Sequence, residues 1–453
     1  MFVSITFICP FLAFGNWVTQ DSGTNLELNS VFFIDSLYGW AVGGGGNSGI
    51  ILRTTNGGQN WLTAYTDTQS IFEAAWFISR QTGWVAGGRD NYVVMDSTCQ
   101  KILKTTDGGI TWQRQWNRNS SSNWRCLYGV CFVGNNGWAT VEGWNDNPES
   151  TGCIIHTTDG GTTWTTQSLV GAYCLCPWDI HFPSISRGVC SGGINLYPYD
   201  NTDGHIWYTS NGGTSWSSGH NWVPGTAAMG FFTNVWMVDT LKGWCVGSAF
   251  GMSVREPGRV ARTTNGGQSW SLCNPSPLRP FWGVYFADSS WGWIGTTAGG
   301  ILLTTNSGRN WQDDNSGVTN RISDIHGINR NNAWAVGTNG TIIKYVPSSG
   351  IEYENQISLN ALAKPKISIV PNPFSSRTEI RFDPSVRVHV TELAIYDASG
   401  RSVKPFNHLT CKPLNRISWD GKDETGNSLP GGIYFLEVKV GGTKIREKLI
   451  LVR

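Results

Sequence analysis

The side chains best able to carry out a reaction in this chain are carboxylates. Two carboxyl groups held a few ångströms apart can cleave a glycosidic bond, one acting as the acid and the other as the base or nucleophile. The candidates for such a pair are Glu73, Glu142, Asp146, Asp179 and Asp324. The sequence does not give the distance between any two of them. Whether they form an acid/base pair therefore depends on the elements that hold them.

Aromatic rings with hydrogen-bond donors nearby form a second group, which is suited to binding. Such rings pack against sugars or anchor a protein interface. The candidate binding residues are Trp124, Arg125, Tyr128, Trp178, Phe232, Arg279, Trp282 and Arg321, with Phe231 close by. The competing interpretation is that these rings seal a packed interior, because buried aromatic side chains usually serve packing.

The cysteines and acidic loops do not indicate a cofactor or a metal site. None of the eleven cysteines forms a CxxC pair, which argues against a zinc ribbon. Cys131, Cys190 and Cys245 are expected to be small core residues. The stretch YDNTDG, from Tyr199 to Gly204, lacks the spacing and the closing Glu of a calcium-binding loop.

Composition and the first residues suggest an exported protein. The 453 residues exceed one ordinary core, and a net charge of +1 gives no electrostatic reason to expect nucleic acid or an anionic membrane as partner. The apolar run from Phe2 to Phe14 is too short to span a bilayer but fits the core of a secretory signal peptide, with cleavage before Asn16. The first cation is Arg53, which is compatible with a start codon further upstream. The alternative interpretation is an apolar first strand.

An eight-residue motif occurs six times. The copies are TTNGGQNW ending at Trp61, TTDGGITW at Trp112, TTDGGTTW at Trp164, TSNGGTSW at Trp216, TTNGGQSW at Trp270 and TTNSGRNW at Trp311. The Asp or Asn can accept hydrogen bonds from the following amides, and the glycines can supply the positive φ of a tight turn. The Trp that follows can bury itself against a neighbouring sheet. We therefore assign a structural role to Asn56, Trp61, Asp107, Trp112, Asp159, Trp164, Asn211, Trp216, Asn265, Trp270, Asn306 and Trp311.

Each motif closes a unit of three short strands, and a fourth strand begins at its Trp. Four-stranded units of about 40 to 55 residues predict a β-propeller. A seventh unit, from Ile322 to Val346, has three strands and no motif, while NWVTQDSG, from Asn16 to Gly23, reads as a fourth strand with no blade before it. We therefore predict a seven-bladed propeller over residues 16–346, closed by the N-terminal strand so that no sheet edge stays open.

The repeat resembles the Asp-box (bacterial neuraminidase repeat) families. The GW…TTDGGxTW pattern is most similar to propellers of the photosystem II assembly or stability-factor-like family. This resemblance implies the fold strongly and the function weakly. The Arg-Ile-Pro signature of sialidase-like propellers is absent, and xyloglucan-cleaving propellers that use this octet place two propellers around a cleft, whereas one is expected here.

A second, smaller domain follows a polar linker over residues 347–366. Residues 367–453 alternate strands with Asp-Gly, Asn and Pro-Gly-Gly turns, which predicts a small Ig-like β-sandwich. The module resembles the C-terminal sorting domain of type IX secretion cargo and the Ig-like domain of flagellar hook-capping proteins, although Val370 stands where a Tyr often precedes the PNPF sequence. The residues that carry this resemblance are Pro371, Asn372, Pro373, Phe374, Ile395, Tyr396, Asp397, Gly400, Trp419, Asp420, Gly421, Gly432, Ile433, Tyr434 and Phe435. The resemblance implies export through the type IX secretion machinery; the alternative is a plain spacer.

The loops favour a binding function on one face of the propeller. The loops between second and third strands are long in blades two to five and short in blades six and seven, and binding residues concentrate on such loops. We expect a secreted or cell-surface, non-catalytic, all-β protein that binds a glycan or protein partner, with no cofactor and no transmembrane segment. The alternative is a secreted glycan-cleaving hydrolase of the sialidase or xyloglucanase type. A photosystem assembly role is disfavoured, because the C-terminal module has no evident use in a thylakoid lumen.

Overall fold

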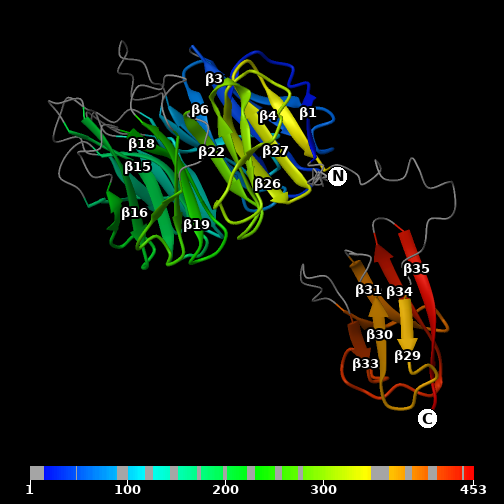
Figure 1. The fold of residues 1–453 in the computed structure, drawn as a ribbon. Coiled ribbons are helices and arrows are strands. Elements are labelled where there is room, and N and C mark those ends of the chain that lie inside the picture. The colour runs from blue at the N-terminus through cyan, green and yellow to red at the C-terminus, as the bar shows by residue number, and fades with distance from the viewer. Residues whose placement is uncertain are drawn as a thin grey trace, which may run out of the picture. The chain divides into compact units, whose positions relative to one another are not determined.

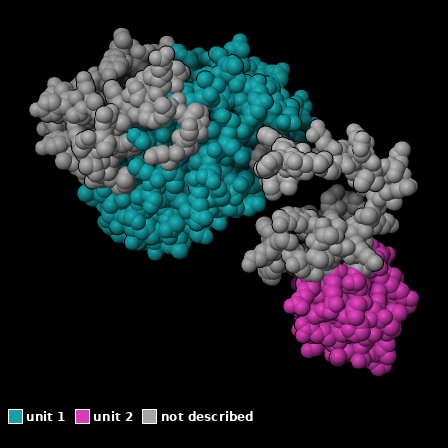
Figure 2. Space-filling view, in the orientation of Figure 1, with its two compact units in different colours: residues 1–349 teal, residues 350–453 magenta. Residues whose placement is uncertain are grey.

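The computed structural model divides into two compact units, Met1–Ser349 and Gly350–Arg453. The structure describes residues 15–46, 48–88, 100–117, 126–142, 152–170, 175–196, 201–221, 230–249, 258–273, 279–347, 367–382, 390–406, 416–440 and 443–453. Almost all regular structure in these ranges is β-strand, as predicted (Figure 1). Figure 2 colours the two units separately.

The described part of the first unit forms seven four-stranded antiparallel sheets, which are the blades of a β-propeller. Blade 1 comprises β2 (Glu27–Phe33), β3 (Gly39–Gly45), β4 (Ser48–Thr54) and β5 (Leu62–Asp67); blade 2 comprises β6 (Ile71–Phe77), β7 (Gly83–Gly88), β8 (Lys101–Thr105) and β9 (Gln113–Asn117); blade 3 comprises β10 (Val130–Val133), β11 (Asn136–Val141), β12 (Cys153–Thr157) and β13 (Thr165–Gln167). Blade 4 comprises β14 (Leu175–His181), β15 (Gly188–Leu196), β16 (Asn201–Thr209) and β17 (Ser217–Asn221); blade 5 comprises β18 (Gly230–Met237), β19 (Gly243–Ala249), β20 (Gly258–Thr263) and β21 (Ser271–Cys273). Blade 6 comprises β22 (Phe281–Phe286), β23 (Gly292–Thr296), β24 (Ile301–Thr304) and β25 (Gln312–Asp313), with a short 3-10 turn, η1 (Thr297–Gly299), between β23 and β24.

Blade 7 takes its strands from both ends of the unit. It comprises β26 (Ile322–Asn329), β27 (Asn332–Gly337), β28 (Ile342–Val346) and β1 (Asn16–Gln20), and β1 pairs antiparallel with β28, Trp17 opposite Tyr345. The Trp17 indole is buried, and its Nε1–H donates to Asp314 Oδ2 at 2.9 Å. The first and last strands of the propeller are thus joined by backbone pairing and by a buried side chain.

The repeated octet forms the turn between third and fourth strands. In blade 2, Asp107 Oδ1 accepts hydrogen bonds from the backbone amides of Ile110 and Thr111, and Thr105 Oγ1 accepts one from Gly109 N. The Thr111 hydroxyl and amide, together with the other donors, hold the pKa of Asp107 below its usual range. Gly108 and Gly109 have φ of 77° and 90°, a region that glycine enters without steric cost. This turn conformation explains why nearly the same residues recur in every copy of the motif.

Five of the six motifs also accept a hydrogen bond from a Trp of the preceding blade. Trp40 of β3 donates its indole N–H to Gly108 O of the blade 2 motif at 3.0 Å, and its ring stacks on Phe77 at 3.5 Å. The same bond and stack recur for Trp84 on Phe132, Trp138 on Phe182, Trp244 on Phe286 and Trp334 on Phe33. In blade 4, Val189 replaces the Trp and lies against Gly267. Blade 7 has no motif, and there Asp314 accepts the N–H of Trp293 at 3.1 Å.

The second unit contains two antiparallel sheets around one core. One sheet has the order β29 (Ile367–Val370), β30 (Thr378–Phe382), β33 (Arg416–Trp419); the other has the order β32 (Ser402–Pro405), β31 (Val390–Asp397), β34 (Gly432–Val440), β35 (Thr443–Leu451). Trp419 is fully enclosed, and its ring packs on Phe374 and Tyr434. The unit is an Ig-like sandwich, as the turn pattern predicted.

Candidate functional site

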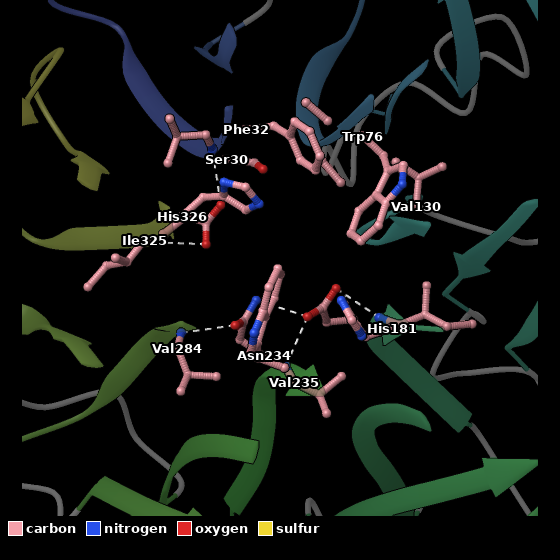
Figure 3. Close-up of a pocket in the computed structure, with 17 residues that line it drawn as sticks. Ser30, Phe32, Trp76, Val130, His181, Asn234, Val235, Val284, Ile325 and His326 are labelled. Atoms are coloured by element: carbon pink, nitrogen blue, oxygen red, sulfur yellow. Dashed lines mark hydrogen bonds between the residues drawn. The ribbon is translucent and has the colours of Figure 1, made fainter. Parts of the chain in front are cut away.

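A small cavity lies on the axis of the propeller. Its volume is about 60 Å³, and its lining includes residues from the first strands of all seven blades, β2, β6, β10, β14, β18, β22 and β26 (Figure 3). The rings of Phe32, Trp76 and Trp236 form apolar walls, while two Asp-Ile-His sequences supply most of the polar groups. One lies in β14 (Asp179 to His181), and the other at the same position of β26 (Asp324 to His326).

The two aspartates make matching bonds to the next blade. Asp179 Oδ2 accepts the backbone amide of Val235 in blade 5 at 2.9 Å, and Asp324 Oδ2 accepts that of Val31 in blade 1 at 3.0 Å. Each also accepts the amide of the following Ile at 2.8 Å. Asn234, at the equivalent position of blade 5, accepts the amide of Val284 in blade 6 at 2.9 Å. Asp179, Asp324 and Asn234 therefore each join their own blade to the next one by a hydrogen bond.

Burial changes the acidity of these groups. Loss of solvation raises the pKa of Asp179 to about 7, more than its bonds to backbone amides lower it, and the charge of Asp324 raises it further. Burial also raises the pKa of Asp324. Two acids with raised pKa values in one cavity resemble a hydrolytic pair. Their oxygens, however, are occupied by donors from the protein's own backbone.

The two histidines are held as neutral rings. Burial lowers the pKa of His181 and of His326 to about 3. His326 Nδ1 accepts the amide of Phe33 at 3.2 Å, and its ring stacks on Phe32 at 4.4 Å. His181 packs against Trp236, with ring centroids 4.5 Å apart, and its buried Nδ1 has no partner among the residues described.

The other carboxylates named from the sequence do not join this pair. Glu73 precedes the channel residues of β6, and Glu142 is buried just after β11. Asp146 lies outside the described residues. Neither Glu73 nor Glu142 lines the cavity that holds Asp179 and Asp324.

A β-bulge precedes the channel residues in six of the seven first strands. The register shifts between Leu28 and Ser30, Phe72 and Ala74, Pro177 and Asp179, Phe232 and Asn234, Phe281 and Val284, and Ile322 and Asp324. A bulge adds an unpaired residue and re-aims its side chain, and bulges are common next to functional sites. Trp178 and Trp282 are both bulge residues. The bulges thus place a side chain that differs from blade to blade at the mouth of the channel. This mouth lies at the end of the propeller opposite the octet turns, and we call that end the loop face.

Three adjacent blades contribute a stack of rings to the loop face. Tyr128 of blade 3 stacks on Trp178 of blade 4 with ring centroids 5.1 Å apart and an interplanar angle of 17°. Trp178 in turn packs against Phe231 of blade 5 at 4.7 Å. All three side chains are half-buried, so each retains a surface that solvent reaches.

Across the same mouth, blades 6, 7 and 1 form a charged group. The Arg321 guanidinium lies over the Trp282 ring at 4.3 Å, and it forms an ion pair with Glu27. Burial lowers the pKa of Arg321. Arg279 is also half-buried and lies two residues before the start of β22, close to Trp282 in sequence.

The residues predicted to bind therefore fall into three sets. On the loop face, Tyr128 contacts Trp178 and Trp282 contacts Arg321, and Arg279 lies near the start of β22. Trp124 and Arg125 lie outside the described residues. Phe232 is a correction: its ring is fully buried in the core between blades, because the bulge after it turns Phe231 outward instead. Glu27, which the sequence analysis missed, starts β2 and has no motif to mark it.

Cys131, Cys153, Cys190, Cys245 and Cys273 are free thiols in the structure. Within the described ranges, no three His, Cys, Asp or Glu side chains are placed to hold a metal ion. No helix in the described chain is long and apolar enough to cross a bilayer.

The fold defines an all-β chain made of a propeller and an Ig-like domain, and comparisons with known proteins agree. Residues 372–444 match the family model of the FlgD Ig-like domain. No curated protein matches the chain.

Solved propellers resemble the first unit at low sequence identity. The structure titled YCF48 bound to D1 peptide has a TM-score of 0.54 and 19% identity, covering 74% of this chain and 99% of that one. YCF48 from Cyanidioschyzon merolae has a TM-score of 0.52, 15% identity and the same coverages of 74% and 99%. The GH74 xyloglucanase from Xanthomonas campestris has a TM-score of 0.51 and 10% identity, covering 97% of this chain and 74% of that one. At these identities the likeness concerns the fold alone.

Proposed function

We propose that the protein is exported and acts at the cell surface as a non-catalytic propeller that binds a glycan or protein partner through its loop face. The observation that carries this proposal is the stack of half-buried rings from Tyr128, Trp178 and Phe231 on three adjacent blades. Rigid aromatic side chains that keep one face free are typical anchors of binding sites. The Trp282, Arg321 and Glu27 group across the mouth adds hydrogen-bonding capacity.

The chemistry of the channel supports binding over hydrolysis. A glycosidase needs one free acid and one free carboxylate at the sugar. Asp179 and Asp324 are instead half-buried, and their oxygens accept hydrogen bonds from backbone amides of the next blades. A propeller of similar fold that holds a peptide is known in YCF48, and this supports binding as one use of the fold.

The C-terminal domain supports export. Its match to the FlgD Ig-like domain, together with its resemblance to type IX sorting domains, leads us to propose that residues 367–453 address the chain to the type IX secretion machinery. In the native host, removing residues 367–453 should abolish surface display while intracellular propeller accumulates. Undiminished display of the truncated chain would refute the sorting role.

The binding role is tested with the full chain on immobilised polysaccharides and surface proteins of the host. Trp178→Ala with Trp282→Ala should reduce retention at least tenfold, since aromatic anchors often contribute 2 kcal/mol or more, as an order of magnitude. Trp291→Ala is the matched control, because Trp291 is a half-buried indole with an arginine, Arg330, 5.5 Å away on the opposite face. Newly formed reducing ends in the same wells would favour the hydrolase alternative.

A further inference from the structure

A second pocket lies between blades 5 and 6, beside the octet turns. Its volume is about 400 Å³, within the range of small-ligand sites. It is formed by Trp236 to Asp239 and Lys242 of blade 5, and by Tyr285 to Ser289 of blade 6. It stands apart from the loop face, and the inference drawn from it does not rest on the proposed function.

The floor of this pocket is apolar and fixed in position. Trp236 Nε1–H donates to Phe286 O at 3.0 Å, which ties the indole across the junction of the two blades. The Tyr285 ring packs against it in a T-shaped arrangement at 5.0 Å. Met237 is buried beside them. A ligand in the pocket would meet the partly exposed indole of Trp236 without rearranging it.

The rim carries polar groups with unused hydrogen-bonding capacity. Asp239 Oδ1 accepts the amides of Leu241 and Lys242 at 2.7 Å, whereas Oδ2 has no partner among the described residues. The Lys242 ammonium forms no ion pair within that part of the chain. Burial and the nearby charge of Asp288 raise the pKa of Tyr285, so the phenol that packs against Trp236 in the floor stays neutral.

The charges around the pocket balance. Asp288 is paired with Arg330, and Asp239 lies in the same lining as Lys242. An anion would meet two carboxylates, and a cation would meet an ammonium and a guanidinium. The ligand that fits is neutral, with one apolar face for the indole and several hydroxyl groups for the rim. We propose that this pocket binds a neutral saccharide of one or two rings.

The test uses the full chain with cellobiose, maltose and chitobiose as probes, followed by saturation-transfer NMR and calorimetry. At least one neutral disaccharide should bind saturably, more tightly than glucuronic acid or glucosamine. Lys242→Met and Asp239→Asn should each weaken that binding about tenfold, as expected for the loss of a hydrogen bond to a charged group. Lys242→Arg should restore part of it.

Two controls separate this site from other effects. Arg187→Met changes the cation at the equivalent turn position of blade 4, and it should leave disaccharide binding unchanged. Disaccharide binding that persists in the Trp178→Ala, Trp282→Ala variant and is lost on adding Lys242→Met belongs to this pocket, so failure at the loop face and failure here are distinguishable. Absence of saturable binding by all three disaccharides, preference for a charged sugar, or full binding by folded Lys242→Met would overturn the proposal.

Discussion

The two ends of the propeller differ in how far their side chains repeat from blade to blade. At the end with the octet turns, the same indole bond and ring stack recur at five blade junctions, from Trp40 on Phe77 to Trp334 on Phe33. At the loop face, the bulge residues differ from blade to blade: Asn29, Glu73, Trp178, Thr233, Trp282 and Ser323. Repetition at one end supplies stability, and this leaves the other end free to vary.

Arginine groups show the same contrast. Arg80 lies 4.3 Å from the Tyr38 ring and pairs with Asp35 on the octet side, in the same combination as Arg321 with Trp282 and Glu27 on the loop face. The side chain of Arg80 is 51% exposed and that of Arg321 is 27% exposed. Water screens the Arg80 ion pair more strongly, so the same combination of residues contributes less to stability on the octet side than on the loop face.

The largest expected effect comes from removing the strand that closes the ring. Deleting residues 16–23 removes the β1–β28 ladder and the buried Trp17, and should lower the melting temperature by more than about 10 °C. Val18→Ala, at a side chain 50% exposed on the same strand, should leave the melting curve in place. An unchanged curve for the deletion would show that β1 does not hold the ring closed.

Tryptophans at the two ends should differ in their contribution to stability. Trp138→Ala empties a fully buried site, loses the bond to Gly212 and should cost about 3–5 kcal/mol of unfolding free energy. Trp178→Ala removes one half-exposed ring from a stack and should cost about 1–2 kcal/mol. Chemical denaturation measures both. Equal losses would contradict the division of roles between the two ends.

Asp179→Asn should change how stability depends on pH. Burial raises the pKa of Asp179 to about 7 in the folded chain, above its unfolded value of about 4, so its protonated form favours folding at low pH and that contribution is lost as pH rises through 7. The wild type should therefore lose stability relative to Asp179→Asn between pH 5 and pH 8, by roughly 1–3 kcal/mol. Asn234 already makes the corresponding hydrogen bond from blade 5 to blade 6, so an amide is tolerated at this position of the first strand.

Paired denaturation series at pH 5 and pH 8 check this sign. His181 and His326, whose pKa values are about 3, contribute equally to both proteins and cancel in the difference. A constant difference across the range would mean that Asp179 is ionised in the folded chain at pH 5.

The smallest expected difference is between the two arginines. Arg321→Met should lower stability by about 1 kcal/mol, because it leaves Glu27 half-buried without its partner. Arg80→Met should cost less than about 0.5 kcal/mol, as is usual for exposed ion pairs. Thermal melts at low and high salt separate the two, and a larger loss for Arg80→Met would reverse the ranking.

The sequence predicts the fold better than the site, for a physical reason. In the octet, Asp107 or its counterpart accepts hydrogen bonds from amides three and four residues away. Because these contacts are local, the residues of the octet predict its conformation directly. Asp179 of blade 4 and Asp324 of blade 7 line the same cavity only because the propeller closes on itself. The choice between Phe231 and Phe232 depends on a single-residue bulge, which inverts the alternation of side chains and leaves no mark in the sequence.

The pairing of β1 with β28 also constrains the order of folding. Residues 16–20 leave the ribosome before the other strands of the propeller, yet their partner strand ends at Val346, more than 300 residues later. Until then, the first strand has no edge to join, and blade 7 cannot be completed. Contacts so distant along the chain form slowly and expose unpaired edges in the meantime. The propeller is therefore expected to reach its closed form only after β28 has been synthesised, which leaves a period in which the chain is still open and available to a chaperone or an export apparatus.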